Sequence, residues 1–198
     1  MQYAVKETLV EYDSEDQFAK VLAYISLAPI LIGVAHLAIT YAYRNLNSAI
    51  FLAGQGVSLL VNKFLKETIQ QDRPNIVKFA IKTRKTYGMP SDHVQYMSFF
   101  AIYFMLFTVT LRRYKDELFI DSVIKVIEVF AALFLTVLVG ISRVYLGYHT
   151  VNQVFVGGIV GTSLALTWWG FSQWIFHSQA ARLRNYFPRF FNVKQKVQ

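Results

Sequence analysis

The chain alternates long apolar runs with short charged clusters. Residues 21–43 form the first run and carry no Asp, Glu, Lys or Arg. Further apolar runs with few charges lie at about 45–65, 93–112, 122–142 and 150–176. A helix needs about 20 predominantly apolar residues to cross a bilayer, and uncharged runs of this length are rare in soluble cores. The pattern therefore predicts five transmembrane helices.

A backbone in lipid has to satisfy its hydrogen bonds within its own helix, because no water is present there. The predicted fold class is therefore all-α: a polytopic transmembrane helix bundle of about five spans. Gly33, Gly54 and Gly56 lie in the first two spans and favour close helix approach. The transmembrane domain is expected over residues 21–178.

The two ends of the chain are polar. Residues 1–20 are expected to form an acidic N-terminal tail, since they lack the basic start and apolar run of a secretory signal peptide. A helix on the membrane surface, or a further membrane helix, is the alternative for this segment. Residues 179–198 are expected to form a basic C-terminal tail.

Composition agrees with a membrane protein and raises a question about charge. The hydrophobic share is 55% and the charged share 16%, against about 45–50% and 25% in soluble proteins. The net charge is nevertheless +8, which is typical of proteins that bind nucleic acid, anionic lipid or a phosphorylated substrate. The absence of cysteine excludes disulfides, thiolate metal sites and a cysteine nucleophile.

Five spans fix which loops share a side of the membrane. The N-terminus, the segment 63–92 and the turn 142–149 are expected on one side. Three clusters of polar residues with phosphate-binding chemistry fall on that side, so the position of the charges favours a phosphorylated lipid and argues against nucleic acid.

The first cluster contains Lys66, Arg73 and Pro74. Lys66 and Arg73 are seven residues apart, so on one helix that ends at Pro74 they would project from the same side. Two such cations can clamp a multiply charged oxyanion, with the arginine offering a planar fork. The alternative is a solvated basic patch beside the membrane.

The second cluster, residues 88–93, reads Gly-Met-Pro-Ser-Asp-His and comes directly before the third span. Ser91 can cap that helix or donate its hydroxyl to a phosphate at the helix N-terminus. His93 has the ordinary pKa range for proton transfer. A simple helix cap beside an interfacial histidine is the alternative.

The third cluster contains Arg143, His149 and Gln153. His149 and Gln153 are four residues apart and share a helix face. Gln153 can accept a hydrogen bond from Nδ1–H of His149 and so leave Nε2 free to attack. A charged residue at membrane depth is costly and usually functional; an arginine that reaches toward the interface beside an unrelated histidine is the alternative.

Together the three clusters resemble the type 2 phosphatidic acid phosphatase superfamily, whose motifs are K-x6-R-P, P-S-G-H and S-R-x5-H-x3-D. The resemblance covers about residues 63–160. The motifs around His93 and His149 are most similar to the dolichyl-diphosphatase branch of that superfamily, which has glutamine at the position of Gln153. Asp92 departs from the family, where a small residue is usual, and its carboxylate opposes phosphate binding unless it points away or pairs with a cation.

The resemblance implies a role for each site residue. His149 is the nucleophile that forms a phosphohistidine, His93 is the general acid and base, and Gln153 orients His149. Four residues bind phosphate: Lys66, Arg73, Ser91 and Arg143. No cofactor or metal is implied, and the sequence shows no ligand cluster for a metal ion.

The implied reaction is hydrolysis of membrane-embedded dolichyl diphosphate to dolichyl phosphate, which recycles the lipid carrier of protein N-glycosylation. A phosphatase of broader lipid specificity is the first alternative. A non-catalytic lipid-phosphate binder, suggested by Asp92, is the second. Oligomeric state cannot be inferred from the sequence.

Location is indicated by the loop charges. Ten Lys and Arg residues lie on each side; leaving out the three phosphate-binding candidates gives seven against ten, which favours a cytosolic C-terminus and a lumenal active site. Lys194 and Lys196 resemble a dilysine retrieval signal of the endoplasmic reticulum, with a basic tail on anionic lipid as the alternative. His36 is expected to be a packed or hydrogen-bonded residue inside the first span.

Overall fold

A computed structural model describes residues 2–5, 10–13, 15–74, 87–110 and 119–186. For most of the residues in β1 and β2, and for residues 176–186, it describes the backbone alone. The chain forms six helices in this part: α1 (Gln17–Ile25), α2 (Ala28–Tyr43), α3 (Leu46–Ile69), α4 (Asp92–Thr110), α5 (Phe119–Tyr145) and α6 (Val151–Tyr186). Two short strands, β1 (Gln2–Val5) and β2 (Val10–Asp13), precede them. The dilysine pair Lys194 and Lys196 lies outside the described residues.

Five stretches of helix are long and apolar enough to cross a membrane, which confirms the predicted number of spans. Their limits are 17–43, 46–69, 92–110, 119–145 and 151–175. The first span joins α1 and α2. The break between them at Ser26 and Leu27 precedes Pro29, which lacks an N–H and would clash with the carbonyl four residues earlier in a continuous helix.

The N-terminal segment differs from the expected polar tail or surface helix. Strands β1 and β2 form an antiparallel hairpin in which Tyr3 pairs with Tyr12 and Val5 with Val10. Aromatic and β-branched residues favour strands, and this local preference outweighs the acidic composition from which the tail was predicted. The hairpin leads into α1, where Asp16 accepts a hydrogen bond from the backbone N–H of Ala19 at 2.9 Å.

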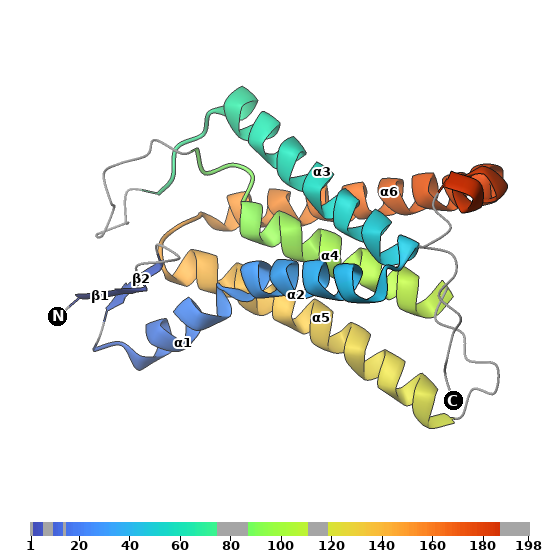
Figure 1. The fold of residues 1–198 in the computed structure, drawn as a ribbon. Coiled ribbons are helices and arrows are strands. Elements are labelled where there is room, and N and C mark those ends of the chain that lie inside the picture. The colour runs from blue at the N-terminus through green and yellow to red at the C-terminus, as the bar shows by residue number, and fades with distance from the viewer. Residues whose placement is uncertain (1, 6–9, 14, 75–86, 111–118, 187–198) are drawn as a thin grey trace.

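Helix α4 is the central element of the bundle (Figure 1), and it packs most extensively against α6 and α5. Two small apolar clusters surround it: Tyr96 and Met97 contact Ala28 and Val139 at one level. Phe99 and Tyr103 pack with Phe51 and Ala165 at another. The helix that carries the second sequence motif is thus held on several sides.

His36 lies between α2 and α3, and the structure confirms that it is a hydrogen-bonded residue within the first span. Its Nδ1 is 2.9 Å from Oε1 of Gln55, and its Nε2 is 3.1 Å from Oγ of Ser48. The polar groups of this histidine are therefore satisfied by the neighbouring helix, away from the three motif clusters.

Close approach of α4 and α6 depends on two glycines of α6. A Cβ atom at Gly157 would lie 2.7 Å from the carbonyl oxygen of Ser91. A Cβ atom at Gly161 would collide with the carbonyl oxygen of Gln95. Both contacts are with backbone atoms, which cannot rotate away as a flexible side chain can.

We expect Gly161→Ala to lower the melting temperature of the detergent-solubilised protein. Overpacking of this kind costs typically about 1–3 kcal/mol. Gly170→Ala is the matched control on the same helix, because its Cβ would meet nothing within 4 Å. Equal melting temperatures for the two variants would contradict the packing described here.

Candidate active site

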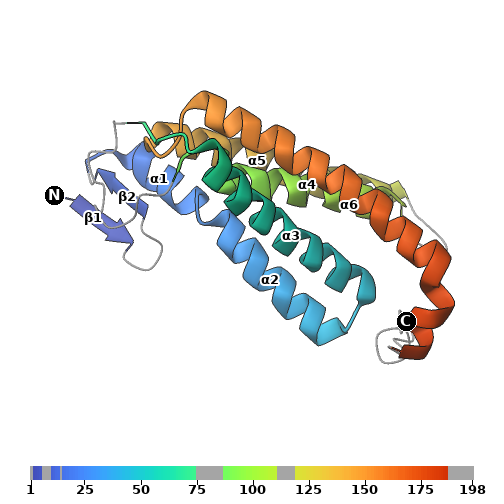
Figure 2. The same ribbon diagram turned by 90° about the horizontal axis from the view of Figure 1, so that it is seen from above.

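The three motif clusters meet at one end of the bundle. The C-terminal ends of α3 and α5 and the N-terminal ends of α4 and α6 lie together there (Figures 1 and 2), near the β-hairpin. No span separates the first two motifs, and two spans, α4 and α5, separate the second motif from the third, so all three lie on one side, as the sequence predicted.

Lys66 and Arg73 come from different local structures, which corrects the prediction that one helix carries both. Helix α3 ends at Ile69, and Gln70 adopts a left-handed conformation with φ 52° while its N–H bonds the carbonyl of Lys66. Pro74 therefore does not end the helix. This left-handed cap turns the chain, so that Arg73 reaches the site from the non-helical segment after Gln70.

Arg73 and Arg143 meet at Tyr148. The guanidinium of Arg73 donates to the carbonyl of Tyr148 at 3.3 Å, and that of Arg143 lies over the Tyr148 ring, 4.1 Å from its centroid. Arg143 is 4% exposed, and its Nε has no hydrogen-bond partner among the described residues. Lys66, Arg73 and Arg143, called the cationic cluster below, lie close enough to repel one another, so the cluster favours a bound anion.

A tight turn between α5 and α6 positions His149. Gly147 has φ 76°, a conformation that glycine adopts without strain, and the N–H groups of Tyr148 and His149 both bond the carbonyl of Arg143. The side chain of His149 is 1% exposed. Burial, reinforced by the nearby arginines, lowers the pKa of His149 to about 4, so the ring is neutral at physiological pH.

The hydrogen bonds of His149 fix its tautomer. Nδ1 lies 2.9 Å from the carbonyl oxygen of Gly88 and 3.3 Å from Oε1 of Gln153. A carbonyl only accepts, so Nδ1 carries the proton and Nε2 keeps its lone pair. Nε2 is buried without a hydrogen-bond partner among the described residues. The sequence named Gln153 for this role but missed the shorter contact with Gly88.

Gln153 also links the first motif to the third. Its amide Nε2 donates to the carbonyl of Asp72 at 2.9 Å and to Oε1 of Gln71 at 3.2 Å. Its backbone carbonyl accepts from the N–H of Ser91 at 3.0 Å. A Cβ atom at Gly88 would lie 2.6 Å from Nε2 of Gln153, which explains why the second motif begins with glycine. An aspartate at position 153 would supply none of the donated bonds.

Ser91 stands directly before α4. Its hydroxyl is buried and has no hydrogen-bond partner within the described part of the chain, so it does not cap α4 there and remains able to donate to a ligand. Asn62, which the sequence analysis did not single out, donates to the carbonyl of Pro90 and to Oε1 of Gln95. A buried amide inside an apolar span is the signal that would have pointed to it.

Asp92 pairs with a cation, as its position in the second motif required. Its Oδ1 is 3.4 Å from Nζ of Lys66, 3.4 Å from Nδ1 of His93 and 3.7 Å from Nε2 of His149. The carboxylate therefore contacts both candidate catalytic histidines and also Lys66 of the cationic cluster. No group of three or more His, Cys, Asp or Glu side chains is arranged to hold a metal ion in the described ranges.

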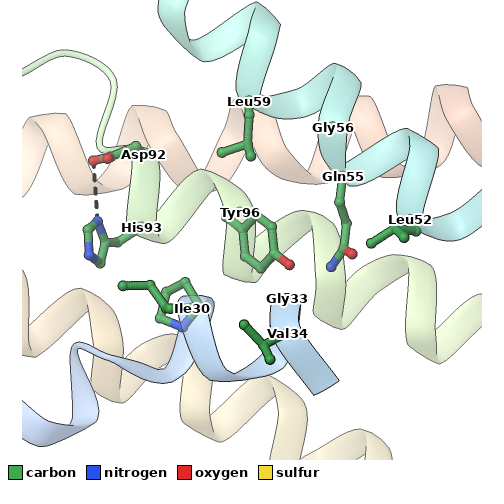
Figure 3. A pocket seen from close by; sticks show the side chains of 11 residues that line it. Ile30, Gly33, Val34, Leu52, Gln55, Gly56, Leu59, Asp92, His93 and Tyr96 are labelled. Carbon is green, nitrogen blue, oxygen red and sulfur yellow. Dashed lines mark ion pairs between the residues drawn. The ribbon is translucent and has the colours of Figure 1, made fainter. Parts of the chain in front are cut away.

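A groove leads away from these residues between α2, α3 and α4. It has a volume of about 520 Å³. Figure 3 shows Asp92 and His93 at one end and Leu52, Gln55 and Val34 toward the other. Its lining is mostly apolar, and Ile30, Val34 and Leu59 are exposed on the sides of their helices. In a membrane these helix faces would contact lipid.

Comparison with known proteins identifies the family. The sequence model of the family described as "PAP2 superfamily" matches residues 47–177, which is more than half of the chain. The chain belongs to the PAP2 superfamily. This confirms the family predicted from the three motifs, and the PAP2 fold accounts for the arrangement of the five spans.

Several PAP2 relatives are similar to most of the chain. Dolichyldiphosphatase 1 of Mus musculus is 38% identical over 168 residues, which cover 84% of this chain and 70% of that protein. Dolichyldiphosphatase of Saccharomyces cerevisiae is 37% identical over 160 residues, covering 78% and 64%. Lipid phosphate phosphatase gamma of Arabidopsis thaliana is 34% identical over 184 residues, covering 88% and 74%.

The fold resembles a solved PAP2 structure. A transmembrane PAP2 type phosphatidylglycerolphosphate phosphatase from Bacillus subtilis superimposes with a TM-score of 0.64 at 27% sequence identity. The match covers 80% of this chain and 78% of that one. The transmembrane PAP2 fold predicted from the sequence is therefore confirmed.

Proposed function

We propose that this chain is a lipid diphosphate phosphatase that hydrolyses dolichyl diphosphate to dolichyl phosphate and inorganic phosphate. The observation that carries the proposal is the free Nε2 of neutral His149 within 3.7 Å of Asp92, next to the cationic cluster and at the end of an apolar groove. The names of the mouse and yeast relatives support a polyprenyl diphosphate as the substrate.

The first step would be an in-line attack of His149 Nε2 on the terminal phosphorus. The bond between that phosphorus and the bridging oxygen breaks as the N–P bond forms, and the lipid monophosphate leaves. His93, whose side chain keeps 22% of its surface exposed, would donate a proton to the leaving oxygen. Arg73, Arg143 and Lys66 would stabilise the charge on the phosphoryl oxygens, the main contribution to catalysis in phosphoryl transfer.

The second step would release phosphate. A water molecule attacks the phosphohistidine, His93 takes the proton of that water, and the N–P bond breaks to return neutral His149. The carbonyl of Gly88 holds Nδ1–H throughout both steps, so the ring keeps the same orientation for attack and for departure. Ser91 Oγ, buried without a partner in the described residues, would donate to a phosphoryl oxygen.

The groove suits the hydrocarbon part of such a substrate. Apart from the catalytic end, its polar lining in the described structure is Gln55 and the hydroxyl of Tyr96. A polyprenyl chain that entered sideways between α2 and α3 would bury apolar surface there while its diphosphate lay beside His93 and His149. The substrate would then reach the site without leaving the bilayer.

The substrate is tested by comparing kcat/KM on dolichyl diphosphate, dolichyl phosphate and phosphatidate with purified protein. We expect dolichyl diphosphate to be preferred by at least about tenfold, because its leaving group is already a phosphate. Equal or faster turnover of phosphatidate would favour a broader lipid phosphatase, which the similarity to the Arabidopsis protein supports. Binding without turnover of any lipid would identify a non-catalytic binder.

Gln153→Glu tests the link between the first and third motifs. Glutamate preserves side-chain length and an acceptor for His149 Nδ1 but lacks the amide that donates to Asp72 and Gln71. Gln153 is 0% exposed, so the glutamate would place a buried carboxylate against the carbonyl oxygen of Asp72, which is costly, and we expect kcat/KM on dolichyl diphosphate to fall about tenfold or more. Asn152→Asp, at the neighbouring exposed position, is the control; equal rates for the two variants would contradict this role.

We further propose that the protein resides in the endoplasmic reticulum membrane with a lumenal active site and a cytosolic C-terminus. The loop-charge balance and the names of the relatives support this placement. The chain has no cysteine, so single cysteines report topology without background. In sealed microsomes, Asn47→Cys in the first turn of α3 should react with a membrane-impermeant maleimide, and Asn152→Cys should react only after permeabilisation. The reverse pattern would invert the orientation.

A further inference from the structure

The carboxylate of Asp92 occupies the space in front of the nucleophilic atom. Its Oδ1 is 3.7 Å from Nε2 of His149 and 3.4 Å from Nδ1 of His93. Reacting atoms in a productive complex are about 3–3.5 Å apart, so a phosphorus atom poised for attack would lie in nearly the same place as this oxygen. The substrate phosphoryl group and the Asp92 carboxylate therefore exclude each other.

The charges around Asp92 are those that would hold a phosphate. Oδ1 lies 3.4 Å from Nζ of Lys66, and Asp92 attracts the guanidinium of Arg143. Ser91 Oγ, Arg143 Nε and His149 Nε2 are all buried without a hydrogen-bond partner among the described residues. Asp92 thus neutralises part of the cationic cluster but leaves several phosphate-binding groups of the site unused.

The side chain of Asp92 is also partly exposed to solvent. Its side chain keeps 37% of its surface exposed although Oδ1 itself is buried. It belongs to the first turn of α4, where a negative charge is favourable in any rotamer because of the helix dipole. Figure 3 shows the side chain at one end of the groove, next to His93. Exchange for a ligand would require rotation about the side-chain bonds of Asp92 only.

We propose that Asp92 is a tethered competitor that displaces inorganic phosphate from the active site and so selects lipid-anchored phosphates over free phosphate. The inference rests on the proposed phosphatase function. An anion attached to the protein returns to the cationic cluster at a high effective concentration. Free phosphate has only its charge to oppose this competition, whereas a lipid phosphate gains additional binding from its hydrocarbon chain in the groove.

The test is inhibition by inorganic phosphate in Asp92→Asn, which keeps the shape of the side chain and removes its charge. We expect the Ki of phosphate against dolichyl diphosphate to fall on the order of tenfold, with a smaller decrease in KM. Asp92→Ser serves as a second variant if the first fails to fold. Asp121→Asn, in the first turn of α5 at the opposite end of the bundle, is the matched control and should leave Ki unchanged.

Two outcomes would overturn the proposal. A Ki that is unchanged or higher in both Asp92 variants excludes a competitor. A loss of kcat with unchanged KM and Ki would instead mark Asp92 as a partner that orients His93, with which it lies in contact.

A binding measurement separates this proposal from the proposed function. Titration of purified wild-type and Asp92→Asn protein with inorganic phosphate, without lipid substrate, reports the competition directly. Tighter binding to the variant supports the competitor even if the wild-type protein hydrolyses none of the lipids tested. Equal binding to both proteins rejects it even if the wild-type protein is an active phosphatase.

Discussion

Replacing His149 with alanine should lower kcat on dolichyl diphosphate by about 10⁵- to 10⁶-fold, which is the effect of removing a nucleophile from an enzyme that forms a covalent intermediate. The side chain is buried, its Nδ1–H is held by Gly88, and its Nε2 has no hydrogen-bond partner in the described structure. The Gln153 side chain, whose Oε1 lies 3.3 Å from Nδ1 of His149, is not a nucleophile that can replace it. Phosphate release by purified protein is the measurement.

His36→Gln is the control for this variant. His36 is also an intramembrane histidine with two hydrogen bonds, but it belongs to the contact between α2 and α3 and should be dispensable for chemistry. Turnover in His149→Ala that equals turnover in His36→Gln would reject His149 as the nucleophile.

The covalent intermediate can be observed separately. With substrate labelled in its terminal phosphate, the His93→Ala protein should accumulate label, because the water that attacks the phosphohistidine lacks its base. The label should be stable in alkali and lost in acid, as expected for a phosphoramidate. Label retained by the double variant of His93 and His149 would place the phosphoryl group on another residue.

Replacing Arg143 should have the second largest effect. We expect Arg143→Ala to lower kcat/KM about 10³-fold or more, the size of effect found when a positioned cation is removed from a phosphoryl-transfer site. Arg143→Lys keeps the charge but loses the planar fork and its stacking on Tyr148, so we expect an intermediate loss of about 10²-fold. Steady-state kinetics on dolichyl diphosphate measures both.

Lys63→Ala is the matched control for charge. Lys63 lies on α3 one turn before Lys66 and is exposed, so it contributes to the electrostatic field near the membrane without entering the site. If Arg143→Ala and Lys63→Ala lowered kcat/KM equally, the cationic cluster would be a solvated basic patch that attracts anionic lipid and not a binding site for the phosphoryl group.

The spans were predictable because each is a property of a single stretch of sequence. The 27 residues of Phe119–Tyr145 are long and apolar enough to span a bilayer wherever they pack. That the three motifs share one side of the membrane follows from the number of spans between them alone. The family was likewise accessible, since it depends on residue types at fixed spacings.

What the sequence did not reveal depends on backbone geometry between segments. The end of α3 was expected at Pro74, but the left-handed Gln70 ends it earlier and bends Arg73 toward Tyr148. The carbonyl of Gly88 fixes the tautomer of His149. Every residue has a backbone carbonyl, so the residue type at position 88 could not have indicated this contact. The β-hairpin was missed because its short strands lie within an acidic segment.

Asp92 shows a further limit of reasoning from motifs. The sequence marks Asp92 as a departure from the family pattern. Because a carboxylate repels a phosphate, Asp92 was expected to pair with a cation or to point away from the site. Its geometry shows that it pairs with Lys66 while facing Nε2 of His149, a position that residue spacing alone does not give.

The size of the groove between α2, α3 and α4 bears on how efficiently the protein hydrolyses polyprenyl diphosphates of different chain length. Its volume of about 520 Å³ is that of an ordinary small-molecule pocket, far less than a whole polyprenyl chain occupies. The isoprene units nearest the diphosphate would fill it, and all later units would remain among the acyl chains of the bilayer. Short polyprenyl diphosphates that fill the groove should therefore be turned over as efficiently as full-length ones, and carrier length would be set by the enzymes that build the lipid.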